Sequence, residues 1–549
     1  MRYPLHSNLP YNESRHEGEK DLISPEPLVR LRNFFLNPTA DAVSAAKTCY
    51  SSKIVSPEDL SDEDIKTVGK TTYEGGHHTV YQHEMFEFEL SNVSRAFVHD
   101  FLHTHPFYNS SQSSQRYVRL KEPKATFPPL SDSTARSIFK KAVVRSYEIY
   151  EELTNLLIDD ISEQYKFALS GKFLGPENIG NKAQREVKEK AMEAARYALS
   201  IAAHTHLIHT IDGVTLWRYF RMKNLSWESK IVVSKMIEQV RTVDPNFPRF
   251  VEEEHGEYLR EVMPEHAFDR RLDINKDGDK VVEEFDRSLD GKHAKLISWT
   301  PDAEEVVADC VRQVLGYHKA QLGDLDALDL VLNPSKNIYL IDTLNLSIVS
   351  PLTRVLAHAL YTFRKKLSHT ADSQNQRHRT IPASRPLTFA IDTIEPDYIT
   401  PELISRNREI RALYDEWMKE IWEQKNKLLA YGVPIEHANY VLPNGLAIRI
   451  TETGSMLHLW YKYTNRSCLR AQEEIWRITM EEITQINQVH PNLGKYLGPP
   501  CFIRKMHHHN REVSEEIGKV KYCNQGRLYC RQPIWDIYPN VSIDNILRV

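Results

Sequence analysis

Two distant stretches of this sequence present the same features in the same order: an apolar-faced helix, a polar loop and a closing Gln-Arg pair. The helices are predicted over Val93–His105 and Leu352–Phe363, because apolar residues recur there at helical spacing. The loops after them lie in Ser110–Val118 and Asp372–Arg379. This repeated order predicts an internal duplication, with coincidence as the alternative, and constrains the fold more than any other feature.

A polar stripe supports the comparison of the two helices. Arg95 and His99 lie one turn apart in the first helix, and Arg354 and His358 take the corresponding places in the second. Just before the first helix, Met85–Leu90 alternates apolar and acidic residues, which predicts a half-buried strand. The first half is therefore expected to run from strand to helix at this point.

A charged, turn-rich segment separates the two halves and predicts a connector. We predict a first domain over residues 1–250, a connector over 251–300, a second domain over 301–500 and a C-terminal tail over 501–549. Stretches poor in Pro and Gly predict long helices in both halves, at Ser137–Gln164, Val187–His209, Arg406–Leu429 and Arg470–Val489.

Length and composition restrict the class of protein. The chain has 549 residues, more than one hydrophobic core usually serves, and its 26% of charged residues is the balance of a folded protein. A net charge of −5 gives no reason to expect nucleic-acid binding, and no apolar run predicts a membrane span or a secretory leader. Six cysteines in a chain this long do not predict a disulfide framework, so we expect a cytoplasmic enzyme.

The segment Gly76–Val118 is the densest group of candidate ligand-binding residues. Ser114 and Arg116 lie in a Ser/Gln-rich loop whose hydroxyls, amides and guanidinium could bind a phosphate. His77 and Thr79 follow a glycine pair that allows a tight turn close to a ligand. Each residue alone would be an ordinary surface residue, so it is the combination that predicts an anion site.

Taken in order, these motifs resemble the flavin-dependent thymidylate synthases of the ThyX type. The matching residues of the first half are Cys49-Tyr50, Gly76-His77-His78-Thr79, Gln82-His83, Val93-Ser94-Arg95-Ala96, His99, Ser114-Gln115-Arg116-Tyr117 and Ala195-Arg196-Tyr197. In the second half they are Leu442-Pro443, Arg466 and Ala471-Gln472-Glu473-Glu474-Ile475. The resemblance therefore covers both halves.

Some positions depart from the family pattern. The family's Arg-His-Arg triplet, which reaches the flavin, falls at His103-Thr104-His105 in the first half, and Gln82 replaces a glutamate. A literal triplet stands at Arg377–Arg379, but our alignment of the two helices pairs Arg377 with Arg116 and makes that triplet accidental. Flavin binding by the first half is thereby put in doubt.

The resemblance implies an α+β fold of two fused ThyX-like domains, each a mixed sheet packed with long helices. It also implies reductive methylation of dUMP to dTMP, with methylenetetrahydrofolate as the carbon donor and FAD, reduced by NADPH, as the hydride source. Family members assemble as homotetramers, so two fused copies imply a homodimer that forms a pseudo-tetramer. The alternative is a catalytically altered or inactive descendant that binds a nucleotide or a flavin.

The resemblance assigns roles to individual residues. Cofactor binding is expected at His77, Thr79, Gln82, His103 and His105. Substrate binding is expected at Ser114, Arg116, Arg377 and Arg466. The family needs no enzymic cysteine, so no catalytic nucleophile is assigned. Because neither half carries every family residue, we predict a composite site that draws on both halves.

Two possible metal sites are interpreted as turns, so no metal is predicted. Asp273, Asn275, Asp277, Gly278 and Glu284 have the spacing of a calcium-binding loop. Lys280 stands at an apolar position of that loop and no second loop is visible, which leaves a calcium-controlled scaffold as a minor alternative. Cys501, Cys523 and Cys530, with His507–His509 between them, could hold zinc, but their spacing matches no CxxC pairing.

Overall fold

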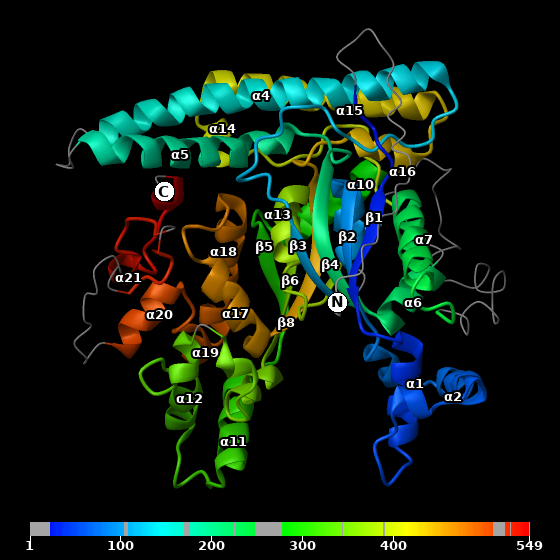
Figure 1. The fold of residues 1–549 in the computed structure, drawn as a ribbon. Coiled ribbons are helices and arrows are strands. Elements are labelled where there is room, and N and C mark those ends of the chain that lie inside the picture. The colour runs from blue at the N-terminus through cyan, green and yellow to red at the C-terminus, as the bar shows by residue number, and fades with distance from the viewer. Residues whose placement is uncertain are drawn as a thin grey trace.

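The computed structural model describes residues 22–103, 108–169, 176–222, 226–247, 277–342, 344–387, 390–508, 522–526 and 529–547. Two four-stranded sheets lie at its centre, beneath a layer of long helices (Figure 1). None of the helices in these ranges is long and apolar enough to cross a membrane.

The first sheet has the strand order β1-β2-β4-β3, and all its neighbouring strands are antiparallel. Its strands are β1 (Leu28–Phe34), β2 (Met85–Ser94), β3 (Tyr108–Gln112) and β4 (His204–Asp212). The predicted strand Met85–Leu90 is confirmed as the first part of β2. Its apolar and acidic residues alternate between a buried and a less buried face, as the pleat of a strand requires.

The second sheet has the corresponding order β5-β6-β8-β7. Its strands are β5 (Ala294–Trp299), β6 (Leu360–Ser368), β7 (Ala383–Ser384) and β8 (Ala447–Ser455). These pairs are antiparallel too, whereas we predicted mixed sheets. The alternation of buried and less buried residues in β2 and β6 suits an antiparallel sheet with one covered face. Strand β5 lies in the segment that was predicted to be a connector.

Helices of the first half surround the first sheet. They are α1 (Pro38–Thr48), α2 (Asp62–Glu74), α3 (Arg95–His103), α4 (Ser133–Leu169), α5 (Pro176–Ala195), α6 (Gly213–Arg221) and α7 (Trp227–Arg241), with 3-10 segments η1 (Pro57–Asp59), η2 (His78–Gln82) and η3 (Arg196–Ala198). The helix predicted over Val93–His105 is confirmed as α3. The helix predicted over Val187–His209 ends at Ala195. From His204 the chain forms β4, whose β-branched Thr and Ile residues favour a strand.

The second half has a similar helical content. Its longer helices are α10 (Gly278–Leu289), α11 (Ala303–Leu315), α12 (Asp324–Leu332), α13 (His369–Asn375), α15 (Arg408–Ala430), α17 (Met456–Arg466), α18 (Glu473–Val489) and α20 (Pro500–His507). Shorter elements are η5 (Ile338–Ile341), η6 (Leu346–Ile348), η7 (Thr353–His358), α14 (Glu402–Ser405), α16 (Ile435–Ala438), η8 (Asn439–Val441), α19 (Pro491–Gly494), α21 (Ile534–Ile537) and α22 (Ile543–Leu547).

The helix predicted over Leu352–Phe363 is wrong. Its first part is the short 3-10 segment η7, and its last residues begin β6, where Tyr361 and Phe363 are buried on one face with the period of a strand. Arg354 and His358 are exposed in η7. They therefore do not correspond to the polar stripe of α3.

The serines that end β2 and β6 give the correct correspondence between the halves. Ser94 accepts a hydrogen bond from the third residue of α3, and Ser368 accepts one from the third residue of α13. In each half a buried glutamate on a later helix accepts bonds from the backbone N–H and hydroxyl of that serine. Glu228 on α7 does so for Ser94 and Glu474 on α18 for Ser368.

When the two halves are aligned on these serines, Arg377 corresponds to His103 and not to Arg116. The literal Arg377–Arg379 triplet therefore aligns with His103–His105, and our pairing of Arg377 with Arg116 is wrong. The error came from the misplaced helix at Leu352–Phe363, which shifted the alignment of everything after it.

The two halves are joined by a reciprocal crossing of residues 197–202 and 440–445. Four backbone hydrogen bonds of 2.7–3.1 Å run between them, two donated by each half. Tyr197 donates to the capping glutamate of the second half, and Tyr440 donates to that of the first. Each half therefore supplies a tyrosine to the helix cap of the other.

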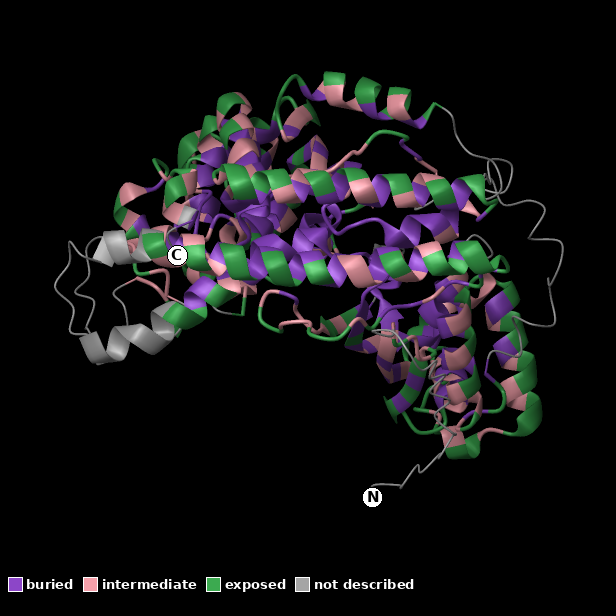
Figure 2. Cartoon of the chain, turned by 90° about the horizontal axis from the view of Figure 1, so that it is seen from above, coloured by how far each residue is buried: buried purple, intermediate pink, exposed green. Residues whose placement is uncertain are grey.

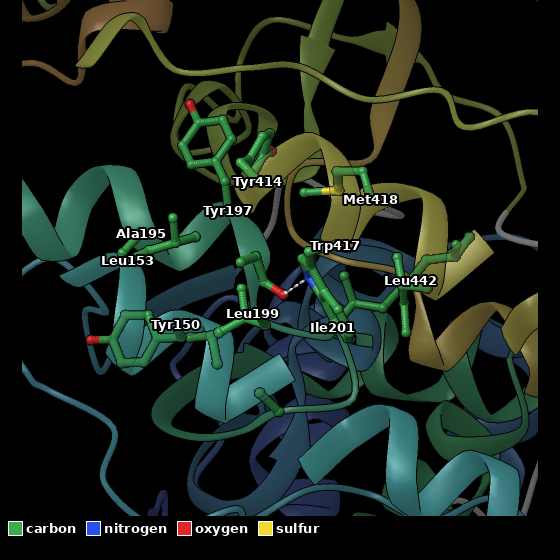
Figure 3. Packing of buried hydrophobic residues seen from close by; sticks show 14 of the residues in the cluster. Tyr150, Leu153, Ala195, Tyr197, Leu199, Ile201, Tyr414, Trp417, Met418 and Leu442 are labelled. Atoms are coloured by element: carbon green, nitrogen blue, oxygen red, sulfur yellow. Dashed lines mark hydrogen bonds between the residues drawn. The ribbon is translucent and has the colours of Figure 1, made fainter. Parts of the chain in front are cut away.

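One hydrophobic core extends across this crossing (Figure 3). Tyr150 and Leu153 on α4 pack with Trp417 and Met418 on α15 around Leu199, and the Trp417 indole donates to the Ala198 carbonyl oxygen at 3.0 Å. Figure 2 shows how buried and exposed residues alternate along the long helices that cover this core. The two halves therefore share a hydrophobic core and are not independent bodies.

Candidate functional site

Five arginines from the two halves lie within electrostatic reach of one another, and we call them the arginine cluster: Arg95, Arg116, Arg196, Arg377 and Arg466. Burial, followed by the charges of Arg377 and Arg116, lowers the pKa of Arg466 to about 10. Burial, followed by the charges of Arg196 and Arg377, lowers the pKa of Arg95 to about 9. Positive charge has therefore been concentrated where water is partly excluded.

The fold brings these side chains together from separate elements. Arg95 begins α3 where β2 ends, and Arg116 follows β3 in the polar loop. Arg196 begins η3, just before the crossing segment. Arg377 comes shortly after α13, and Arg466 is the last residue of α17. The site depends on both sheets and on the crossing between the halves.

Two cluster arginines of the first half are fixed by contacts that reach the second half. Arg116 forms an ion pair with Glu193 and donates across the junction to the Arg470 carbonyl oxygen at 3.0 Å. Arg196 donates across it to the Gln472 side chain at 2.8 Å. Because residues 470–472 follow Arg466 closely, one short segment of the second half organises arginines of the first.

Arg466 is oriented within its own half. Its Nε donates to Nε2 of His378 at 3.0 Å, and a terminal nitrogen donates to the Gln374 carbonyl oxygen at 2.8 Å. His378 is the middle residue of the triplet and is nearly buried. The triplet thus helps to set the direction of the Arg466 guanidinium.

The cluster has more positive charge than its protein partners neutralise. Among the ion pairs of the described residues, only Glu193 pairs with a cluster arginine. Nε of Arg95 and the amide nitrogen of Gln115 are buried donors that have no hydrogen-bond partner in the described part of the chain. Unmatched guanidiniums and unused donors together fit an anion with several oxygens, and a phosphate is the best match in shape.

The predicted substrate residues are therefore largely brought together. Arg116, Arg377 and Arg466 all belong to the cluster. Ser114 lies beside it, and its hydroxyl accepts a hydrogen bond from the backbone N–H of Arg116 at 3.2 Å. Arg95 and Arg196 were not predicted as site residues. Both lie in motifs that carried the family resemblance, which was the signal available for them.

The predicted cofactor residues lie elsewhere. His77, Thr79 and Gln82 are exposed in and beside η2, and no described contact links them to the arginine cluster. His103 ends α3 without a described side chain, and His105 lies outside the described residues. Their roles stay predictions.

The triplet itself reaches across the junction. Arg377 is exposed at the edge of the cluster, where partial desolvation and then the charge of Arg116 lower its pKa. Arg379 donates to the Tyr108 carbonyl oxygen and to the Asn109 side chain, and its guanidinium lies 4.9 Å from the centre of the Tyr108 ring. The triplet therefore holds one arginine against the first sheet and leaves one open to a ligand.

A buried group of four charges supports the triplet from behind. Lys365, Lys462, Glu452 and Glu482 are at most 4% exposed, and each lysine is paired with both glutamates. Asn375, the last residue of α13, donates to Glu452 at 2.5 Å. The four charges balance, so this group can fix the end of α13 without adding net charge to the site.

The corresponding place on the other side of the junction has different chemistry. There His369 stands in the position of Arg95, Asn439 in that of Arg196, and Asp100 in that of Gln374. These residues line a cavity of about 70 Å³, and Arg449, which also lines it, is paired with carboxylates. The described structure therefore has one arginine cluster for two similar halves.

The segment with the spacing of a calcium-binding loop, which we interpreted as a turn, is only partly described. Asp273 and Asn275 lie outside the described residues, Glu284 is exposed on α10, and Asp277 pairs with Lys280 at 2.7 Å.

Comparison with known proteins relates both halves to one family. Residues 30–246 and 295–492 match the family described as "Thymidylate synthase complementing protein". A flavin-dependent thymidylate synthase of Clostridium tetani is 30% identical over 229 residues, which are 40% of this chain and 85% of the relative. Flavin-dependent thymidylate synthases of Saccharolobus solfataricus and Sulfurisphaera tokodaii are 32% and 31% identical, over 38% and 40% of this chain and 78% and 84% of theirs.

Proposed function

This chain belongs to the family of thymidylate synthase complementing proteins, and from that premise we propose that it is a flavin-dependent thymidylate synthase that binds dUMP at the arginine cluster. The reaction is the reductive methylation of dUMP to dTMP. Methylenetetrahydrofolate supplies the carbon, and FAD, reduced by NADPH, supplies the hydride when it is bound.

The surplus of guanidinium groups in the cluster is the observation that carries this proposal. A nucleotide phosphate would accept charge-assisted bonds from several arginines at once and offset the burial, and the smaller mutual repulsion, that lower their pKa values. Arg116 and Arg466 come from different halves, so the phosphate would be held across the junction. Fixing the phosphate in this way would orient the uracil for reaction without any nucleophile from the protein.

The triplet fits the flavin better than its first-half counterpart. Arg377 is an exposed guanidinium next to the nucleotide site, and such a group can donate to flavin or pyrophosphate oxygens. We assign Arg377 to this contact and keep His77, Thr79 and Gln82 as cofactor residues. Because those three are exposed and apart from the cluster, they are available to a neighbouring chain.

We also propose that the chain contains two copies of one domain and that two chains pair as a homodimer. The equal strand orders, the equivalent helix caps and the two matched segments support the duplication. The second copy would include β5, which pairs along β6. A homodimer of such chains would hold four copies and is testable by light scattering.

The test uses the full-length protein and measures dUMP binding by calorimetry, with dTMP formation as a second readout. Arg116→Ala and Arg466→Ala should each abolish nucleotide binding, whereas Arg354→Ala, which removes an exposed arginine of η7, should not. Normal binding by either cluster variant contradicts a site shared between the halves. Tight dUMP binding without dTMP formation in the presence of FAD, NADPH and methylenetetrahydrofolate would instead favour a catalytically altered descendant.

A further inference from the structure

The last segment of the chain is packed against the rest of the molecule. Its described residues are 522–526 and 529–547, and we call them the end segment. Ile534 and Leu547 are buried members of the hydrophobic core that spans both halves. The end segment lies beyond residue 492, where the second family match ends. It is therefore an addition to the two matched segments that shares their core.

Arg470 contacts both the end segment and α5. One of its terminal guanidinium nitrogens donates to the Tyr529 carbonyl oxygen and to the Glu186 carboxylate, at 3.3 Å in each case. Arg531 of the end segment pairs with the same carboxylate, also at 3.3 Å. Figure 1 shows the end segment, in red, below α5, which carries Glu186. A buried carboxylate shared by two guanidinium groups makes charge-assisted bonds to both, so Arg470 is fixed from two sides.

The backbone of Arg470 belongs to the turn between α17 and α18 and touches the arginine cluster. Its carbonyl oxygen accepts a hydrogen bond from Arg116 at 3.0 Å, and Arg116 is also paired with Glu193. Glu186 and Glu193 are seven residues apart on α5, which is close to two helical turns and places both on one face. The same face of α5 therefore holds Arg116 directly and holds its acceptor through Arg470.

We propose that Arg470 is a positioning residue for Arg116 and that the end segment completes the phosphate site by fixing Arg470. The inference rests on the proposed function, which places the dUMP phosphate at the arginine cluster. In the described part of the chain, Nε of Arg116 pairs with Glu193 and Nη2 donates to Arg470, whereas Nη1 makes no hydrogen bond. The two contacts set the plane of the guanidinium and leave Nη1 for a phosphate oxygen.

Loss of this anchor should affect binding more than chemistry. Without the Arg470 side chain, the carbonyl oxygen at this turn is less restrained, and Arg116 has to be ordered when dUMP binds. An ordering cost of this kind is the same in the substrate complex and in the transition state, so it changes KM and not kcat. A residue with a purely structural role would instead lower stability and activity together.

The test uses the full-length protein and measures dUMP affinity by calorimetry, together with KM for dUMP and kcat of dTMP formation. Arg470→Ala should weaken dUMP binding by roughly 10-fold, the effect of about one hydrogen bond to a charged group, with kcat changed by less than about twofold. Arg470→Lys keeps a cation that can reach Glu186 and should recover most of the affinity.

Arg531→Asn tests the end segment itself. Arg531 has a left-handed backbone (φ 60°) that asparagine adopts readily, and its side chain is 40% exposed, so the change is mild for folding. We expect dUMP binding to weaken about 2- to 3-fold, since Glu186 retains Arg470. Lys505→Ala is the matched control, because it breaks the ion pair of α20 with Asp536 of the end segment and leaves Arg470 untouched. It should bind dUMP as the wild-type chain does.

Three results would overturn the inference while the proposed function stands. They are unchanged dUMP affinity in Arg470→Ala, a fall in kcat without a rise in KM, or a loss in Lys505→Ala as large as that in Arg531→Asn. The comparison of Arg531→Asn with Lys505→Ala stays decisive if Arg470→Ala does not fold. A wild-type chain that does not bind dUMP would overturn the proposed function, and this inference with it.

Discussion

Arg466 combines two tasks in one side chain. Its guanidinium donates hydrogen bonds to His378 and to the Gln374 carbonyl oxygen. The same group lies within electrostatic reach of Arg377 and Arg116. A lysine would keep the charge but lose the fork, because an ammonium group is a point charge. The identity of the residue should therefore matter beyond its charge.

We predict that Arg466→Lys weakens dUMP binding by roughly 10- to 100-fold. One charge-assisted hydrogen bond contributes about 1.5–3 kcal/mol, and each 1.4 kcal/mol is a factor of ten in affinity. Calorimetric titration measures the change, with Arg354→Lys as the control on an exposed arginine of the same half. Equal affinities in both variants would mean that Arg466 contributes only charge.

His209 shows a residue whose protonation opposes folding. It is fully buried in β4, its ring lies 5.0 Å from that of Phe101 between centroids, and neither of its ring nitrogens has a partner among the described residues. Burial, followed by the charge of Arg379, lowers its pKa to about 3. The unfolded chain binds a proton at this residue near pH 6.5, so stability is full above that pH and falls as the pH drops towards 3.

We predict that this residue alone costs about 2 kcal/mol of unfolding free energy between pH 7 and pH 5, since each unit of pKa difference corresponds to 1.36 kcal/mol. His209→Phe removes the titrating group and should make the protein less sensitive to acid by that amount. Denaturant unfolding at the two pH values measures it. His318→Phe, at an exposed position, should leave the pH dependence unchanged, and a variant at His209 that unfolds as steeply with acid would refute the assignment.

At the scale of elements, the junction between α4, α15 and the crossing segments joins the two halves. Trp417 is 1% exposed, belongs to the core that spans both halves and donates to the Ala198 carbonyl oxygen. Removing its indole would leave a cavity and an unpaired carbonyl at the same time.

We predict that Trp417→Ala lowers the free energy of unfolding by about 3–5 kcal/mol, the usual cost of such a core truncation. It should also weaken dUMP binding, because the arginine cluster is assembled across this junction. Trp299→Ala, which removes a 40% exposed indole on β5, should cost about 1 kcal/mol or less. A stable Trp417→Ala protein with normal dUMP binding would show that the junction is not needed to build the site.

Local patterns predicted the elements with a single clear period. Strand β2 and helix α3 follow from their alternation and apolar face, and α18 from its helical spacing. Leu352–Phe363 failed because its apolar residues satisfy both periods, and tertiary pairing with β5 and β8 decides for a strand. That one error displaced the triplet alignment.

The composite site could be predicted only in outline. Arg116 and Arg466 were identified from their motifs, and their meeting follows from neither motif. It follows from the crossing of residues 197–202 with 440–445, a contact between segments too distant for any local pattern to show.

At the scale of the whole molecule, the pseudo-symmetry of the chain is broken at its ligand sites. The two helix caps and the two crossing segments are equivalent, yet within the described residues the arginine cluster lies on one side of the junction. On the other side, Asn439 and His369 replace two arginines and Asp100 adds a negative charge near the cavity.

We therefore predict that each chain binds one dUMP molecule and not two. Calorimetric titration of the full-length protein should give a stoichiometry of one per chain. Arg196→Asn, which copies the residue of the other side, should remove this binding, because it takes away a buried donor of the phosphate site. Asn439→Arg should not add a second site, since His369 and Asp100 would remain beside it. A stoichiometry of two in the wild-type chain would show that the second side opens to a nucleotide after all, and would leave the proposed reaction untouched.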